Sequence, residues 1–287
     1  MIYVTGGRGW HLGREVVRQL TRAGHRVRVL AASAEEGKVL EASNIEVVVG
    51  DCERPETFAH TLEGVATAMM ITRNSLNFVE METNFIDAAK AARVARVVKL
   101  SALGADVNDE TQVKRSHGRT EEILKQSGLK WTILRPHFFM QNVLWFVDEI
   151  RTRGTISLPM KSVRLGLVDF CDIAAVAGKC LTEEGHDGRT YTLSGPELLC
   201  FYDVAEKLGR AVGIPIQYND MPPDAFRELL IAMGRPAWHA ESMTRSYVLM
   251  SLADEPLSGD VERVLGRRPA SFDQVARDYA HFFGGKR

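Results

Sequence analysis

Four glycines stand close together near the start of this 287-residue chain, and their type and spacing suit the binding of a phosphate group. They are Gly6, Gly7, Gly9 and Gly13. An apolar run precedes them and a helical pattern follows at once. Strand, glycine turn and helix is the order that binds dinucleotides, because glycines let the backbone approach a pyrophosphate and the helix N-terminus offers it N–H groups. We therefore expect a dinucleotide to contact Gly6, Arg8, Gly9, Trp10, His11 and Leu12.

Composition restricts the other partners of the chain. The 36 basic and 37 acidic residues give a formal net charge of −1, which provides no electrostatic footprint for nucleic acid or an anionic membrane. No apolar run approaches the ~20 residues that span a bilayer, and no signal-type leader precedes the first strand. The cysteines show neither metal-ligand spacing nor a disulfide framework; they are Cys52, Cys171, Cys180 and Cys200. These observations predict a cytoplasmic protein without a metal.

Short β-branched runs alternate with helical patterns through the first half of the chain. Alternation of this kind predicts a Rossmann-type α/β fold, a doubly wound parallel sheet with helices on both faces. A ligand then lies beyond the carboxyl ends of the strands, at the switch point of the sheet. The expected strands are residues 1–4, 27–30, 45–49, 66–71, 97–101 and 131–134, and the clearest helices between them are residues 85–92 and 120–126.

The rhythm breaks after Pro136, and a smaller, mostly helical domain is expected from there. Helices are expected near residues 142–150 and 172–181, with strands near 189–193 and 216–218. We expect a dinucleotide-binding domain over residues 1–136, completed by about 166–196, and a substrate-binding domain over residues 137–165 and 197–287.

Several short motifs occur in a fixed order along the chain. They are TGGRG at 5–9, VGD at 49–51, KLSA at 99–102, SGL at 127–129, TILRP at 132–136, FFMQN at 138–142, VD at 168–169, DIA at 172–174 and YTLSGP at 191–196. In this order they resemble the NmrA-like atypical short-chain dehydrogenases/reductases over nearly the whole chain. That family includes NAD(P)H-dependent quinone and dye reductases, reductases of aromatic natural products, and redox-sensing regulators. In one departure from the family pattern, Gly13 stands one residue later than usual.

The residues after the second strand bear on the choice of cofactor. An acidic residue there would hold the ribose hydroxyls of NAD, but the chain has Ala31, Ala32 and Ser33. It also lacks the arginine that relatives commonly carry at this point. Arg8 in the glycine turn could meet a 2′-phosphate, or it is a solvated loop residue. We favour NADP(H), with NAD(H) as the alternative, and place Ala32 beside the adenosine.

The resemblance assigns further contacts to the cofactor. It implies that Asp51 and Cys52 flank the adenine and that Thr72 and Arg73 line the ribose and phosphate side. For Arg73, a plain surface charge is the alternative.

Proton transfer has no tyrosine–lysine pair to rely on. The tyrosine-dependent branch of the superfamily uses Tyr-x-x-x-Lys, and no tyrosine here has a lysine four residues later. The corresponding stretch holds His117, and the resemblance places this position beside the nicotinamide. An imidazole titrating near neutrality could donate a proton or orient the cofactor, and helix capping is the alternative. Ser101, at the end of the fifth strand, is expected to donate a hydrogen bond there or to cap the next turn.

Aromatic and polar residues follow the Arg-Pro pair. His137 stands where relatives often have glycine, at the crossing between the expected domains, and we count it as a catalytic candidate. Phe138, Phe139 and Asn142 are expected to line a substrate pocket, with core packing as the alternative for the aromatic residues.

These features together predict an NAD(P)H-dependent oxidoreductase that reduces a planar, conjugated or aromatic carbonyl or quinone-type substrate, with aromatic natural-product metabolism as one setting. A conjugated acceptor needs little proton assistance, so the missing tyrosine–lysine pair is compatible with it. Two alternatives remain open: an NAD(P)-sensing regulator without catalysis, and an enzyme of the same fold that oxygenates an aromatic polyketide. The oligomeric state is left open.

Overall fold

The computed structural model describes residues 1–6, 11–33 and 43–285. These residues form two compact units. The first combines Met1–Pro136 with Phe170–Thr192, and the second combines His137–Asp169 with Leu193–Arg287.

A sheet of seven strands, counted over the described residues, runs through the first unit in the order β3-β2-β1-β4-β5-β6-β8. The strands are β1 (Ile2–Val4), β2 (Val27–Ala31), β3 (Ile45–Val49), β4 (Thr67–Met70), β5 (Arg96–Leu100), β6 (Lys130–Pro136) and β8 (Arg189–Leu193). The pairs β1–β2, β1–β4, β2–β3, β4–β5 and β5–β6 are all parallel. The predicted doubly wound sheet is thereby confirmed, with its switch point between β1 and β4.

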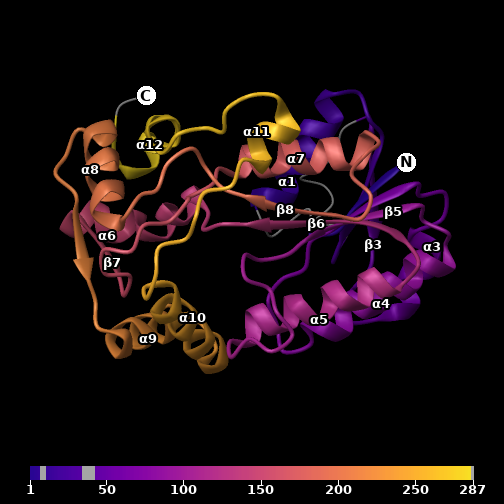
Figure 1. The fold of residues 1–287 in the computed structure, drawn as a ribbon, viewed down its shortest axis with the longest axis horizontal. Helices are drawn as coiled ribbons and strands as arrows, with labels where there is room; N and C mark the ends of the chain where they lie inside the picture. Colours follow the sequence, from indigo (N-terminus) through magenta and orange to yellow (C-terminus); the bar gives the residue numbers. More distant parts are fainter. Residues whose placement is uncertain (7–10, 34–42, 286–287) are drawn as a thin grey trace. The chain divides into compact units, whose positions relative to one another are not determined.

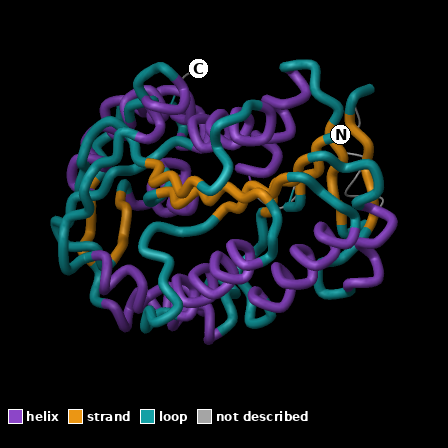
Figure 2. Tube along the Cα trace, turned by 45° about the vertical axis from the view of Figure 1, so that its right-hand side comes forward, coloured by secondary structure: helices purple, strands orange, loops and turns teal. Residues whose placement is uncertain are grey.

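Helices cover both faces of this sheet, as Figure 1 shows. Helices α4 (Phe78–Ala91) and α5 (Gln112–Gln126) lie on one face, and α1 (His11–Arg22) and α7 (Phe170–Thr182) lie on the other. The same layering of purple helices about orange strands can be followed in Figure 2. Tyr3, Phe85 and Leu124 belong to the apolar core beneath α4 and α5. A 3-10 turn, η1 (Pro55–Thr57), and the short α3 (Phe58–Thr61) connect β3 to β4.

Both α4 and α5 begin earlier than the sequence predicted, at Phe78 and Gln112 rather than at residues 85 and 120. Polar residues explain the difference at α5, where the buried residues before Leu124 are His117, Gly118, Thr120 and Glu121. An amphipathic pattern that counts only apolar residues cannot see this face. In α4, Phe78 and Met81 precede the buried Glu82, so an apolar stripe is already present in its first turn.

The second unit is mostly helical around a two-stranded parallel sheet, β7 (Thr155–Leu158) paired with β9 (Gln217–Asp220). The expected helix at 142–150 is a 3-10 segment, η2 (Met140–Phe146), followed by α6 (Val147–Arg153), which ends at a left-handed Gly154. Strand β7 was not predicted, because it is short and directly follows a turn. The remaining elements are α8 (Phe201–Val212), α9 (Pro223–Ala232), α10 (Ala237–Met250), α11 (Asp260–Leu265), α12 (Phe272–Tyr279) and η3 (Ala280–Phe283).

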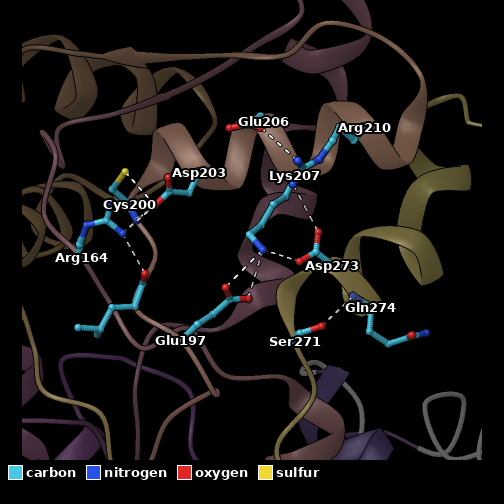
Figure 3. A network of polar contacts seen from close by, with 11 residues as sticks. Arg164, Glu197, Cys200, Asp203, Glu206, Lys207, Arg210, Ser271, Asp273 and Gln274 are labelled. Carbon is cyan, nitrogen blue, oxygen red and sulfur yellow. Dashed lines mark hydrogen bonds and ion pairs between the residues drawn. The ribbon is translucent and has the colours of Figure 1, made fainter.

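Charged side chains tie α8 to segments far away in the sequence, as Figure 3 shows. Lys207 on α8 forms ion pairs with Asp273 at the start of α12 and with Glu197, the latter at 3.3 Å between Nζ and Oε2. One turn earlier on α8, Asp203 accepts a hydrogen bond of 3.0 Å from the Arg164 guanidinium. These contacts hold α8 over the aromatic core of the unit.

No helix among the described residues has the length and apolar character required to cross a membrane. No group of histidine, cysteine, aspartate and glutamate side chains in that part of the chain could hold a metal ion. The four cysteines form no disulfide.

Candidate active site

At the switch point of the sheet, the chain turns tightly after β1 and is hydrogen-bonded to the carboxyl end of β4. The Thr5 N–H donates to the Met69 carbonyl at 3.0 Å, the Ile71 N–H donates to Thr5 Oγ1 at 2.7 Å, and the Thr5 hydroxyl donates to the Ile71 carbonyl at 2.8 Å. Gly6 follows with a left-handed φ of +68°, and a Cβ there would lie 2.9 Å from the Ile71 carbonyl oxygen. Only glycine suits this position, on both counts.

Helix α1 begins at His11, shortly after this turn. Its first turn holds no acidic residue, so the partial positive charge of the helix N-terminus is not opposed there. Leu12 is fully buried and anchors this end of the helix. Arg8, Gly9 and Trp10 lie outside the described residues, as does the side chain of His11. The turn and the helix start that are described fit the pyrophosphate of a dinucleotide.

The loop after β3 is ordered around Asp51. Its carboxylate accepts a hydrogen bond of 3.0 Å from the Glu53 N–H and lies 3.4 Å from Arg54 Nε. The Asp51 N–H donates to Thr57 Oγ1 at 3.0 Å. Ala32, after the neighbouring β2, is exposed. No acidic side chain stands at residues 31–33, where one would select NAD by binding its ribose.

Cys52 and Arg73 extend this edge of the sheet. Burial raises the pKa of the Cys52 thiol to about 12, which leaves it unreactive at neutral pH. Arg73, after β4, is exposed, and its Nη2 lies 2.8 Å from Oε1 of Glu53. This ion pair joins the loops that follow β3 and β4. Thr72 beside it is half-buried.

Ser101 directly follows β5, and its side chain points toward α5. Its hydroxyl donates to Oε1 of the buried Glu121 at 2.5 Å. Arg135 on β6 grips the same carboxylate with Nε and Nη2 and also donates to the Ala105 carbonyl at 3.0 Å. The serine proton is therefore directed at a carboxylate, and Ser101 would have to leave Glu121 in order to donate to a substrate.

His117 lies on α5 in a buried cluster that sequence reasoning did not assemble. Its Nδ1 is 3.4 Å from Nζ of Lys99 on β5, and its ring meets the Phe78 ring edge-to-face at 4.6 Å between centroids. Lys99 in turn pairs with Glu82 of α4 at 2.5 Å, and both of these side chains are fully buried. A signal was present in the sequence, because Lys99 interrupts the apolar strand Val97–Leu100 and a buried lysine requires a partner.

The protonation of His117 differs from the sequence expectation. Burial, the Lys99 ammonium and the Arg135 guanidinium together lower the pKa of His117 well below its ordinary value. The imidazole is therefore neutral at physiological pH rather than titrating near neutrality. A neutral imidazole can still act as a hydrogen-bond donor through its remaining N–H.

The second unit holds His137 and the expected substrate residues. The His137 N–H donates to the Leu193 carbonyl at 2.9 Å, and its buried Nδ1 lies 3.2 Å from Oε2 of Glu255. Half-buried Phe138 packs edge-to-face against Phe201 and Tyr247, with centroids 5.7 and 5.6 Å away.

The two other candidate substrate-binding residues, Phe139 and Asn142, follow Phe138 closely in the sequence. Phe139 forms an isolated parallel bridge with Val168, and Asn142 donates its N–H to the Phe139 carbonyl at 3.1 Å. Both are half-buried. Their part in substrate binding stays a prediction, as do the catalytic roles of the candidate residues.

Comparison with known proteins identifies the family. A sequence model described as NAD(P)H-binding matches residues 6–184. The NAD(P)H azoreductase of Xenophilus azovorans is 33% identical over 287 residues, which cover 99% of each chain. The chain belongs to this NAD(P)H-binding family. The expected resemblance to NmrA-like reductases is confirmed.

Solved structures of other proteins share the fold of this chain. The NADPH-dependent quinone oxidoreductase of Escherichia coli in complex with NADPH superposes with a TM-score of 0.87 at 24% identity, covering 97% of this chain and 99% of the other. The triphenylmethane reductase of Citrobacter sp. gives a TM-score of 0.86 at 21% identity, covering 98% and 99%.

Proposed function

We propose that this protein is a cytoplasmic NAD(P)H-dependent reductase of planar, conjugated acceptors such as quinones and azo dyes. The observation that carries the proposal is the turn at Gly6, which lies against Ile71 at the switch point of the sheet. The chain that holds this turn belongs to an NAD(P)H-binding family. The azoreductase, which matches this chain over 99% of its length, supports an aromatic acceptor.

The proposal assigns cofactor binding to the first unit. The turn at Gly6 and the N-terminus of α1 would hold the pyrophosphate, and the ordered loop at Asp51 would flank the adenine. When bound, the dihydronicotinamide supplies a hydride. His117 would contribute a neutral N–H donor, and the further catalytic candidates are Ser101 in this unit and His137 in the second unit.

Substrate binding is assigned to the second unit. Phe138 offers part of an aromatic face, since it is half-buried and already packs edge-to-face with two rings. Phe139 and Asn142 complete the proposed set. A planar acceptor would gain from stacking on such a surface, and it would need only a hydrogen-bond donor for the negative charge that develops on it.

NADPH is the proposed cofactor. The absence of an acidic residue at residues 31–33 removes the feature that selects NAD, and Arg8 supplies a cation within the glycine turn. Replacing Arg8 by alanine should narrow the preference for NADPH over NADH. A charge-assisted hydrogen bond to the 2′-phosphate is worth about 1.5–3 kcal/mol. Equal affinities for the two cofactors in the parent protein would remove the preference and return Arg8 to a solvated role.

The test of the proposed function is the loss of NADPH absorbance, followed by stopped flow against a panel of quinones and azo dyes. We expect oxidation that depends on the acceptor. A Gly6→Val variant serves as the control, because it should lose cofactor binding and turnover together. Tight NADPH binding without oxidation by any acceptor would refute the reductase and favour an NAD(P)-sensing regulator. Recovery of an oxygenated product would favour an oxygenating enzyme of the same fold.

A further inference from the structure

A buried ion pair lies between the sheet and helix α4 of the first unit. Lys99 comes from β5 and Glu82 from α4, and neither side chain reaches solvent. Removing two charges from water is costly, and their attraction often does no more than offset that cost. Two apolar side chains of similar volume would fill the same space without it. A pair kept at this depth therefore suggests a purpose besides stability.

The lysine has a second partner, and its chemistry fixes a proton. Lys99 Nζ lies 3.4 Å from His117 Nδ1, and an ammonium can only donate hydrogen bonds. His117 Nδ1 must then be the acceptor. Because the ring is neutral, its single proton resides on Nε2. The Phe78 ring packs on both groups, with its centroid 5.3 Å from Lys99 Nζ, and keeps the contact dry.

The glutamate retains unused capacity. Glu82 Oε2 receives the Lys99 ammonium, whereas its Oε1 is buried and has no hydrogen-bond partner among the described residues. Glu82 therefore engages Lys99 through one oxygen, and the cluster joins a donor on Lys99 to an acceptor on His117 Nδ1 and to the carboxylate of Glu82.

We propose that Lys99 and Glu82 are positioning residues that hold the proton of His117 on Nε2 for the reduction of the acceptor. The inference rests on the proposed function. As the acceptor is reduced by hydride, His117 Nε2 would donate a hydrogen bond to the oxygen or nitrogen on which negative charge develops. The Nε2–H bond is kept, and water supplies the proton that completes the reduced product. No proton leaves Lys99, so Glu82 is not left as a lone buried charge.

The tautomer matters because a neutral imidazole carries a single N–H. With Nδ1 engaged by Lys99, that N–H is on Nε2 and is available to the acceptor. Lys99 acts through His117 and is a positioning residue, and Glu82 engages Lys99 in turn.

Other charged groups close to His117 are already engaged. Arg135 from β6 and Glu121 from α5 grip each other, with Nη2 of the arginine 2.5 Å from Oε2 of the glutamate. Asp106, in the loop before α5, accepts the Asn108 N–H at 2.7 Å. Among Lys99, Arg135, Glu121 and Asp106, only Lys99 lies within hydrogen-bond distance of the His117 ring.

Nitrogen-15 NMR of histidine-labelled protein tests the tautomer without any turnover. In the parent protein we expect His117 to be neutral between pH 6 and 8, with its proton on Nε2. In a Glu82→Met, Lys99→Met double variant, which removes both charges together and so avoids a lone buried ion, the preference for Nε2 should weaken. Lys90→Met is the matched control, because Lys90 is exposed on α4. A proton found on Nδ1 in the parent would overturn the proposal.

Turnover supplies the second measurement. With a quinone acceptor, we expect the double variant to lose up to ~10²-fold in kcat, the range for loss of one hydrogen-bond donor to a developing negative charge. The KM for NADPH should change little. No turnover in the parent would refute the proposed function itself. Parent turnover that survives unchanged in a folded double variant would refute the positioning role alone.

Discussion

Replacing His117 by glutamine should remove a stability loss that the parent protein shows in acid. Burial and two cations hold the pKa of His117 well below the value of about 6.5 in an unfolded chain. Below pH 6.5 the unfolded chain binds a proton that the folded protein does not, so stability falls as the pH falls. For one such group the loss between pH 8 and pH 5.5 is about 1.4 kcal/mol, from RT ln(1 + 10^(6.5 − pH)).

Urea unfolding of parent and variant over this pH range measures the effect. Burial also lowers the pKa values of His186 and His239, which act in the same direction, so the informative quantity is the difference between the two proteins. The free-energy difference between parent and variant should change by about 1.4 kcal/mol from pH 8 to pH 5.5. A His60→Gln variant, altered at an exposed position on α3, should follow the parent. Parallel curves for the parent and the His117 variant would show that His117 is not held neutral in the folded protein.

Three further substitutions probe other parts of the structure. Gly6→Ala should cost at least ~1–2 kcal/mol from its left-handed φ and also weaken NADPH binding in calorimetry, because the new Cβ meets the Ile71 carbonyl; unchanged affinity would exclude this turn from the cofactor site. Arg96→Met should destabilise the protein by ~1.5 kcal/mol in urea unfolding, since its buried guanidinium donates to Asp187 at 2.6 Å, and a loss below ~0.5 kcal/mol would mark that pair as unimportant. His137→Ala should lower quinone turnover by ~10²–10⁴-fold with little change in NADPH affinity, and full turnover would remove His137 from the mechanism.

The sheet could be predicted from the sequence because its strands are short, apolar and β-branched. Strands β3 and β8 have the bounds that the pattern predicts, and the ends of the other predicted strands differ by at most two residues. The early turns of α5 could not be found in this way, since the buried residues there are His117, Gly118, Thr120 and Glu121. Polar residues that become buried look like surface residues in a sequence.

The sequence could predict those parts of the candidate site that are formed by neighbouring residues in the chain. The turn at Gly6 is a run of neighbouring residues, and its position between a strand and a helix is visible in the chain. The contact between Lys99 and Glu82 joins residues 17 positions apart, and that between Ser101 and Glu121 spans 20. Such pairs depend on how α4 and α5 pack on the sheet, which no single motif encodes.

Thr5 shows how a sheet can open without leaving its backbone unsatisfied. In a parallel ladder, the rung after the Thr5 N–H to Met69 bond would join the Ile71 N–H to the Thr5 carbonyl. Here the threonine hydroxyl takes the place of that carbonyl and also donates to the oxygen of Ile71. One side chain thus serves both polar groups of a residue where two strands diverge. Valine, although similar in shape, would leave the N–H and the carbonyl of Ile71 without these hydrogen bonds, whereas the hydroxyl of serine could keep both. The residues that position 5 can accept are therefore decided by the need for a hydroxyl group where the two strands diverge, and not by the volume of the side chain.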